Sequence, residues 1–331
     1  AVETAILLEK HDFDSVWLGD HLVDLGGGGK IDPWTIGAAV AVQTKQILIC
    51  SAVSDTQRCH PAKTAHIVAN LDALSKGRAV LGIGAGEAMN IKPFGIEWEK
   101  PDARTERVKE AIQVIELLWT STADDPADYQ GEYYSLHGAF LDLRPTRKPY
   151  PPIYVGALTS ERMLRVVGEC GDGWMGWINT PRTFRERAEK IRWFAEAAGR
   201  RIEEIQLATM LHVALSEDDE ALRKAVQRVK TDLLTERLAL KSFGYEPPPF
   251  PHYQSLTVSR RNEEELERLA MDIPDDVAYR CMAIGDEEEC VEKMEALAKV
   301  GASHIGVMDM FSPEGSKETI ERFEKIMRYF K

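Results

Sequence analysis

The sequence predicts an α/β fold of the (β/α)8 TIM-barrel class, and two observations predict it. Short apolar runs of the kind that form buried parallel strands recur along the 331 residues. Segments with helical periodicity separate these runs, and this alternation is typical of a parallel sheet with right-handed crossovers. An open doubly wound sheet has the same alternation, but barrels of this size routinely fold as one unit. We therefore expect a single barrel domain over residues 1–331.

Seven apolar runs are candidate strands, whereas a barrel of this class needs eight. The seven candidates are residues 15–18, 46–51, 79–83, 152–155, 173–177, 205–210 and 304–308. The chain opens with AVETAILLEK, which has a helical pattern, although such a barrel begins with a strand. We therefore expect that the first strand precedes Ala1 and is missing from this chain.

The segments between these runs have the periodicity of helices. The candidate helices are residues 34–44, 61–75, 103–119, 160–170, 182–198 and 316–330, and a long charged helical stretch over 218–298 that GYEPPPFPHY interrupts. Residues 120–148 are too many for a plain connection, so we expect an insertion there with a short hairpin around residues 131–134. We expect a second insertion at about residues 231–280.

Composition and charge exclude several classes of protein. With 44% hydrophobic and 29% charged residues, the chain resembles ordinary globular proteins, and no segment approaches the ~18 apolar residues of a membrane helix. A net charge of -13 argues against a nucleic-acid partner. The five cysteines form no CxxC or zinc-type spacing, which favours reduced thiols in a cytoplasm and no metal site. We expect a soluble cytoplasmic protein.

Polar residues that follow the predicted strands are the first candidates for chemistry, because barrel active sites lie at the C-terminal ends of the strands. Asp20 and His21 follow the first run, and an acid beside an imidazole can move a proton near neutral pH. A structural cap is the alternative role for this pair. A glycine-rich turn after the third run ends in Glu87 and is followed by Asn90. Neither GxGxxG nor a P-loop motif is present, which disfavours those nucleotide sites.

Two further turns are suited to a ligand. Ser51, Ala52 and Ser54 belong to a run of small residues that lets a planar ligand approach the backbone. The turn at residues 156–159 precedes a predicted helix, whose first backbone amides can hold an anion. Simple capping of this helix by Thr159 is the alternative.

Three stretches of the sequence resemble the bacterial-luciferase-like family of flavin and deazaflavin oxidoreductases. They are FDSVWLGDH, HPAKTAHIVANLDALSKGRAVLGIGAGEAMN and RTERVKEAIQVIELLW, in the same order as in the family. The combination of Asp20-His21 with GAGEAMN is most similar to the coenzyme F420-dependent branch, which includes secondary-alcohol dehydrogenases, sugar-phosphate dehydrogenases and methylenetetrahydromethanopterin reductases. The resemblance implies coenzyme F420 as cofactor, with FMN as the alternative, and a homodimer.

The resemblance also implies roles for individual residues. His21 would take the proton from a substrate hydroxyl while Asp20 or a neighbour holds its ring, and Glu87 would stabilise or protonate the reduced cofactor. The bond between Ser51 and Ala52 is implied to be a non-prolyl cis peptide that bulges against the cofactor ring. The residues implied to line the cofactor are Asp20, Ser54, Ala85, Gly86 and Asn90, and those implied to receive its phosphate tail are Gly156, Ala157, Leu158 and Thr159.

We expect hydride transfer between C5 of the deazaflavin and a small alcohol, ketone or related carbon substrate. The family's dehydrogenases carry a tryptophan where this chain has Leu25. The sugar-phosphate enzymes use a lysine where this chain has residues 179–181, so a phosphorylated sugar is disfavoured. The alternatives are an FMN-dependent luciferase-like monooxygenase, a methylenetetrahydromethanopterin reductase and a non-catalytic flavin-binding barrel.

Overall fold

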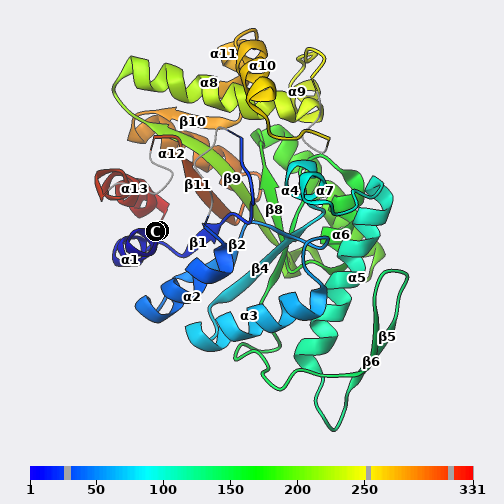
Figure 1. Cartoon of the computed structure of the whole chain (residues 1–331). Coiled ribbons are helices and arrows are strands. Elements are labelled where there is room, and N and C mark those ends of the chain that lie inside the picture. The colour runs from blue at the N-terminus through cyan, green and yellow to red at the C-terminus, as the bar shows by residue number, and fades with distance from the viewer. Residues whose placement is uncertain (26–30, 251–254, 312–316, 331) are drawn as a thin grey trace.

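The computed structural model describes residues 1–25, 31–250, 255–311 and 317–330. Its main feature is a sheet of parallel strands that curves into a nearly closed barrel (Figure 1). The strands pair in the order β1 (Ser15–Leu18), β2 (Leu48–Ser51), β4 (Ala79–Gly84), β7 (Ile153–Gly156), β8 (Gly173–Trp177) and β9 (Gln206–Leu215), while β10 (Met282–Gly285) and β11 (His304–Asp309) both pair with β9 and β3 (Ser54–Asp55) pairs with β4. All of these pairings are parallel.

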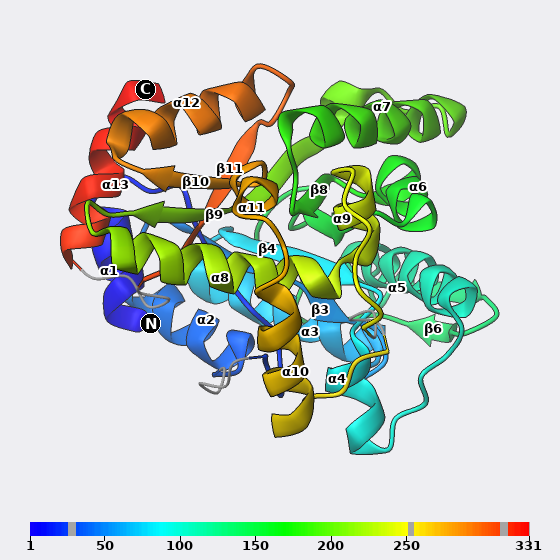
Figure 2. The same cartoon turned by 90° about the horizontal axis from the view of Figure 1, so that it is seen from above.

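Helices alternate with the strands and cover the outside of the barrel (Figures 1 and 2). They are α1 (Val2–Lys10), α2 (Pro33–Gln43), α3 (Pro61–Ser75), α5 (Pro101–Thr120), α6 (Glu161–Cys170), α7 (Pro181–Ala197), α12 (Glu287–Ala298) and α13 (Lys317–Phe330). A short helix, α4 (Ala88–Ile91), and a single 3-10 turn, Lys92–Phe94, follow β4. The predicted TIM-barrel fold is therefore confirmed, and each of the seven predicted strands is present.

In the described part of the chain the barrel has a seam between β1 and β11. Among the described residues, β1 pairs with β2 and β11 pairs with β9, but no ladder joins β1 to β11. Side chains bridge the seam instead: the hydroxyl of Ser15 is 2.9 Å from Nε2 of His304, and the Trp17 ring meets the His304 ring edge-on.

The chain from residue 218 to 298 was predicted as one interrupted helical stretch, and this prediction was incomplete. The structure has α8 (Asp219–Thr235), α9 (Arg237–Ser242), α10 (Arg260–Ala270) and α11 (Asp275–Tyr279), and then β10 before α12. β10 is only four residues long and lies between charged helices, so its apolar signal is weak. The first four of these elements lie across one end of the barrel (Figure 2).

The first insertion contains the predicted hairpin, formed by β5 (Ala127–Gln130) and β6 (Ser135–Ala139). The carboxylate of Glu110 on α5 holds its turn, because it accepts hydrogen bonds from the backbone N–H groups of Glu132, Tyr133 and Tyr134 at 2.8–3.1 Å. The hairpin projects away from the barrel (Figure 1).

The interior of the barrel is filled by side chains from several strands. Cys50, Val80, Tyr154, Met175 and Ala208 form a buried cluster there. A larger hydrophobic core lies between the sheet and the helices. Because side chains pack the interior, ligand space lies above it, at the C-terminal ends of the strands.

Two further features bear on the protein's class. In the part of the chain that the structure describes, no helix is both long and apolar enough to pass through a membrane. All five cysteines are free.

Candidate active site

A cavity of about 1690 Å³ opens at the C-terminal ends of the strands. It is larger than the roughly 300–1,000 Å³ of an ordinary small-molecule pocket, so it has room for a cofactor together with a substrate. The predicted site residues that line it are Asp20, His21, Ala52, Ala85, Gly86, Glu87, Asn90, Gly156, Ala157, Leu158 and Thr159. Residues more than a hundred positions apart therefore meet in one place, as the barrel topology requires.

Two predicted residues, Ser51 and Ser54, do not line the cavity but are buried beneath it. The hydroxyl of Ser51 donates to the carbonyl oxygen of Gly82 and accepts from its N–H, both at 3.0 Å. Ser51 therefore joins β2 to β4. The hydroxyl of Ser54 is buried without a hydrogen-bond partner in the described residues.

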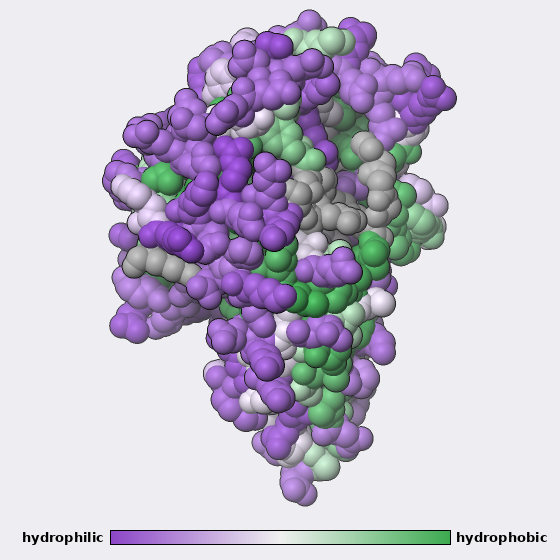
Figure 3. All heavy atoms as spheres, turned by 90° about the vertical axis from the view of Figure 1, so that its left-hand side faces the viewer, coloured by the Kyte–Doolittle hydropathy of each residue, from purple (hydrophilic) through white to green (hydrophobic). Residues whose placement is uncertain are grey.

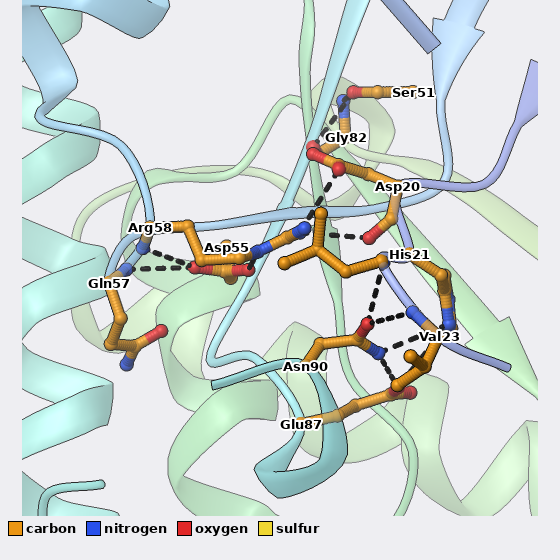
Figure 4. Close-up of polar contacts among 11 residues, drawn as sticks. Asp20, His21, Val23, Ser51, Asp55, Gln57, Arg58, Gly82, Glu87 and Asn90 are labelled. Carbon is orange, nitrogen blue, oxygen red and sulfur yellow. Dashed lines mark hydrogen bonds and ion pairs between the residues drawn. The ribbon is translucent and has the colours of Figure 1, made fainter. Parts of the chain in front are cut away.

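His21, Glu87 and Asn90 form a polar cluster at the cavity wall (Figure 4). Asn90 is oriented by the backbone, since its Oδ1 accepts from the N–H groups of Leu22 and Val23 at 2.7 and 2.9 Å. Its Nδ2 is therefore turned toward Oε2 of Glu87 at 3.3 Å and Nδ1 of His21 at 3.4 Å. Nδ1 of His21 is also 3.6 Å from Oε2 of Glu87. The imidazole is thus held through Nδ1, which leaves Nε2 for a ligand.

The environment of Glu87 changes its acidity. Burial raises the pKa of this carboxyl, and the nearby His21 lowers it, while the negative charge of Asp24 raises it further. The net direction is upward, so Glu87 keeps its proton to a higher pH than an ordinary glutamate. A raised pKa makes this carboxyl a better proton donor to a neighbouring base than a free, ionised glutamate.

Arg58 joins two acidic residues at the base of the site (Figure 4). Its guanidinium donates to the backbone oxygen of Asp20 at 2.8 Å, lies 3.0 Å from the Asp20 carboxylate, and contacts the carboxylate of Asp55 through Nε. Burial lowers the pKa of Arg58, but the charges of Asp55 and Asp20 raise it by more. Arg58 stays charged and fixes the turn after β1.

This arrangement separates Asp20 from His21. The carboxylate of Asp20 is turned to Arg58, whereas the His21 ring lies against Asn90 and Glu87. The resemblance implied that either Asp20 or a neighbouring residue holds the His21 ring. In the structure, Asn90 and Glu87 contact the ring, while the carboxylate of Asp20 faces Arg58. Arg58 was not among the predicted site residues. The Asp55-x-x-Arg58 spacing on a turn was the signal that could have indicated it, because Oδ1 of Asp55 accepts from the N–H of Arg58 at 2.8 Å.

The cis peptide bond is found one residue later than predicted. It joins Ala52 to Val53, so its placement at Ser51–Ala52 was wrong. Strand pairing explains the difference: Ser51 is still in register with Leu18, and the N–H of Ala52 donates to the oxygen of Leu18 at 2.8 Å. The ladder therefore holds the chain in an extended trans form up to Ala52.

Glycines make room for Val53, which lies with Ala52 between β2 and β3 in a short segment that we name the bulge. A β-carbon added at Gly82, Gly84 or Gly156 would lie 2.8–3.0 Å from the methyl groups of Val53. Only glycine lets three strand positions approach Val53 this closely. The bulge and the glycines together make a closely packed wall on one side of the cavity.

The turn at residues 156–159 forms another part of the wall. The indole N–H of Trp174 donates to the oxygen of Ala157 at 2.7 Å and fixes the turn. The hydroxyl of Ser160 caps α6, since it accepts from the N–H of Met163. The basic residues of α5 and α6 that line the same cavity are Arg104, Lys109, Arg162 and Arg165. Two of them are in ion pairs, Lys109 with Glu169 and Arg162 with Asp102. This arrangement can bind an anion.

Among the described residues, no group of three or more His, Cys, Asp or Glu residues is placed to hold a metal ion.

Comparison with known proteins gives a consistent result. The family model of the luciferase-like monooxygenases matches residues 1–304. An F420-dependent glucose-6-phosphate dehydrogenase of Amycolatopsis mediterranei is 30% identical over 313 residues, which are 92% of this chain and 86% of that protein. A phthiodiolone/phenolphthiodiolone dimycocerosates ketoreductase of Mycobacterium tuberculosis is 29% identical over 319 residues, with 88% and 82% of the two chains covered.

Solved structures show the same fold. An F420-dependent secondary alcohol dehydrogenase, solved in complex with an F420–acetone adduct, superposes with a TM-score of 0.84 at 24% identity. The superposition covers 100% of this chain and 94% of the other. The match of the family model over most of the sequence, together with the barrel and its C-terminal cavity, shows that this chain belongs to the luciferase-like monooxygenase family.

Proposed function

We propose that this protein is a coenzyme F420-dependent oxidoreductase that interconverts a small alcohol and its ketone. The observation that carries the proposal is the pairing of His21 with Glu87 in a cavity large enough for a cofactor and a substrate. The relatives named above, an F420-dependent glucose-6-phosphate dehydrogenase and a ketoreductase, support an F420-dependent oxidoreductase.

The residues that line the cavity fit a deazaflavin nucleotide. The bulge and the glycine-rich turn at Ala85 and Gly86 offer a backbone wall for a flat ring. Outside the cavity lining, the amide of Gln57 donates to the oxygen of Ala85 at 3.3 Å and holds this turn. The turn at residues 156–159 and the start of α6 would hold the phosphate, because the backbone N–H groups of a helix start attract anions. The basic residues of α5 and α6 that line the cavity would hold further negative charge on the cofactor.

When bound, the deazaflavin supplies a ring carbon that exchanges a hydride with the substrate carbon. The protein supplies orientation and proton handling. Nε2 of His21 takes the proton of the substrate hydroxyl during oxidation and returns it to the carbonyl oxygen during reduction. Glu87 stabilises the imidazolium that forms, since its Oε2 lies 3.6 Å from Nδ1 of His21. Asn90 keeps both side chains in place.

The residue that follows β8 gives no support to a sugar phosphate as the substrate. Asn179, which follows β8, is buried and donates to the hydroxyl of Thr209 at 3.1 Å. Its Oδ1 accepts from Arg187 at 2.5 Å. Because both ends of this amide are used within the protein, the position serves the structure and not a phosphate.

Turnover with alcohols tests the proposal directly. The enzyme is incubated without oxygen with oxidised F420 and, in separate reactions, 2-propanol, 2-butanol and cyclohexanol. Loss of the F420 fluorescence with at least one alcohol, with no oxygen needed, is the expected result. Consumption of oxygen with reduced FMN, and no reaction with F420, would instead support the luciferase-like monooxygenase alternative.

Replacing Glu87 with glutamine is expected to change both activity and the pH dependence of stability. We expect kcat to fall about tenfold, less than the roughly 10²–10⁴-fold of a lost proton-transfer group. The pKa of Glu87 is raised in the folded state, so the folded protein binds more protons than the unfolded chain between the ordinary and the raised pKa. Stability contributed by protonated Glu87 is present below the ordinary pKa and is lost as the pH rises through the raised one. Because glutamine does not titrate, the Glu87→Gln variant does not lose this stability as the pH rises.

The free energy of unfolding, measured by denaturant titration from pH 4 to pH 9, checks this prediction. The stability of Glu87→Gln relative to the parent should increase with pH across that window. The matched control is Glu97→Gln, a change outside the cavity lining. A constant difference between Glu87→Gln and the parent at all pH values would contradict the assigned environment of Glu87.

We also propose that the protein is a homodimer that associates through α2 and α3. Helix α2 contains no charged residue, although the outer face of a surface helix is ordinarily charged. Val42 on α2 and Leu74 on α3 are 63% and 50% exposed, and the two helices pack together. Figure 3, which shows the side of the molecule where α1, α2 and α13 lie, has an apolar area in its lower half.

Light scattering during gel filtration measures the oligomeric state. The parent should have twice the mass of one chain, and the double variant Val42→Glu, Leu74→Glu should have the mass of one chain. Trp193→Glu on α7, which replaces an apolar side chain that is 62% exposed, is the control and should remain dimeric. A monomeric parent would rule out the dimer.

A further inference from the structure

A second polar group lies in the cavity wall, apart from His21 and Glu87. His212 on β9 meets Asp232 on α8, with Nε2 of the histidine 3.1 Å from Oδ2 of the aspartate. Both residues line the cavity. β9 is not a neighbour of β1, β2 or β4, the strands that lead into the His21 cluster and the bulge. The chemistry proposed above makes no use of this pair.

The alternation of side chains along β9 explains why His212 faces the cavity. Met210 and His212 line the cavity, whereas Leu211 and Val213 belong to the core between the sheet and the helices. Successive side chains of a strand point to opposite faces, so His212 is on the inner face of the barrel. Helix α8 crosses the barrel mouth and brings Asp232 to it (Figure 2).

The wall around His212 contains polar atoms that the protein leaves unsatisfied. The side chain of His212 is 1% exposed, and its Nδ1 has no hydrogen-bond partner among the described residues. The same holds for Nε1 of Trp177 at the end of β8, whose ring centre is 5.6 Å from that of His212. Buried polar atoms are nearly always paired. Two neighbouring exceptions in a cavity wall indicate a place where a ligand completes the hydrogen bonding.

Asp232 is the member of this group that a ligand reaches most easily, because its side chain is 25% exposed. In the described structure its carboxylate has one side-chain partner, His212, which occupies Oδ2. Oδ1 is therefore left as an acceptor, while the indole N–H of Trp177 is a donor only. A hydroxyl group both donates and accepts, so it matches this combination. Asp232 itself would repel a carboxylate or phosphate of a ligand, and such a group would instead favour Lys224 and Arg228, the basic residues of the same helix that line the cavity.

We propose that Asp232 recognises a hydroxyl group of the substrate other than the one that is oxidised, and that His212 positions it. This inference rests on the proposed function and narrows its substrate: the alcohol carries at least two hydroxyl groups. The reacting hydroxyl lies at His21, and the second one donates to Oδ1 of Asp232 and accepts from the Trp177 indole. His212 is a positioning residue, since it acts through the carboxylate.

Binding of matched alcohols tests this assignment without any turnover. The probes are cyclohexanol and its 1,2-, 1,3- and 1,4-diols, which share one carbon skeleton and differ in the second hydroxyl. Dissociation constants are measured by ligand-observed NMR titration, with and without F420. In the parent, at least one diol should bind about tenfold more tightly than cyclohexanol, as expected for a hydrogen bond to a charged group.

Variants separate recognition from general damage to the fold. Asp232→Asn should reduce the preference for the diol to within about twofold, because an amide is a weaker acceptor than a carboxylate. His212→Leu should do the same, whereas His212→Gln, which keeps a donor at the end of its side chain, should retain the preference. Asp219→Asn, a charge change on the same helix but outside the cavity lining, is the control and should keep the full preference.

The outcomes distinguish this inference from the proposed function. Equal binding of cyclohexanol and all three diols to the parent, or an undiminished preference in Asp232→Asn, would overturn the role of Asp232. A diol preference that Asp232→Asn abolishes, in an enzyme that does not reduce F420, would support the recognition site and reject the F420-dependent reaction.

Discussion

Replacing His21 with alanine is expected to lower kcat by about 10²–10⁴-fold, the usual contribution of a positioned general base or acid. The reason is that Nε2 of this imidazole takes the hydroxyl proton while Nδ1 lies against Asn90 and Glu87. No other imidazole of the described residues shares this cluster with Glu87. The affinity for F420 should change by less than about threefold, or about 0.7 kcal/mol.

Steady-state rates with an alcohol and F420, measured from pH 5 to pH 9, check this prediction alongside a fluorescence titration of the cofactor. The control is His137→Ala, which removes an exposed histidine of the β5–β6 hairpin and should leave both quantities unchanged. A His21→Ala variant with the parent's rate at every pH would show that His21 does not transfer the proton.

Replacing Gly82 with alanine is expected to disrupt the cofactor wall. A β-carbon at this position would lie 2.0 Å from the backbone oxygen of Ser51 and 3.0 Å from the Val53 side chain. The backbone cannot shift there without breaking hydrogen bonds, because the hydroxyl of Ser51 is bonded to both the N–H and the oxygen of Gly82. Overpacking of this kind costs on the order of 3 kcal/mol. We expect a loss of stability of that size and no measurable binding of F420.

Denaturant unfolding and the fluorescence titration measure the two effects separately. Gly19→Ala is the matched control, because a β-carbon at this glycine would meet its nearest atom at 3.7 Å, an ordinary contact. This variant should be as stable as the parent. If Gly82→Ala also kept the parent's stability and bound F420 normally, the close approach of Ser51 and Val53 to β4 would be wrong.

Local patterns predicted much of the fold because they depend on near neighbours in the sequence. Helix α3 is found with the predicted bounds, and the hairpin around residues 131–134 is present. β10 escaped prediction because its apolar run is only four residues long and lies between charged helices. A capping box at Asp286 and Glu289 directly after it was the available signal, since it marks the start of a new helix and hence a break before it.

The candidate site was predicted less completely, because it depends on contacts between distant strands. The sequence predicts that Asp20, His21 and Glu87 follow strands, but it does not predict which residues their side chains contact. The carboxylate of Asp20 forms an ion pair with Arg58, and Asn90 accepts a hydrogen bond from the backbone N–H of Leu22, the residue after His21. The acid beside the His21 imidazole is therefore Glu87.

His212 and Asp232 illustrate the same limit. A histidine in the middle of an apolar strand has no sequence partner to mark it, because Asp232 lies on a helix in the second insertion. The packing of α8 across the barrel mouth brings the two together. Such contacts follow from topology and not from local periodicity.

The most direct measurement of the central claim is a fluorescence titration of the purified protein with oxidised F420 and, separately, with FMN. Saturable quenching with F420 and none with FMN at the same concentrations is the result that our account predicts. It would establish the deazaflavin cofactor on which the roles of His21 and Glu87 depend. Saturation by FMN, with no response to F420, would contradict the account and move the protein to the oxygen-using enzymes of its family.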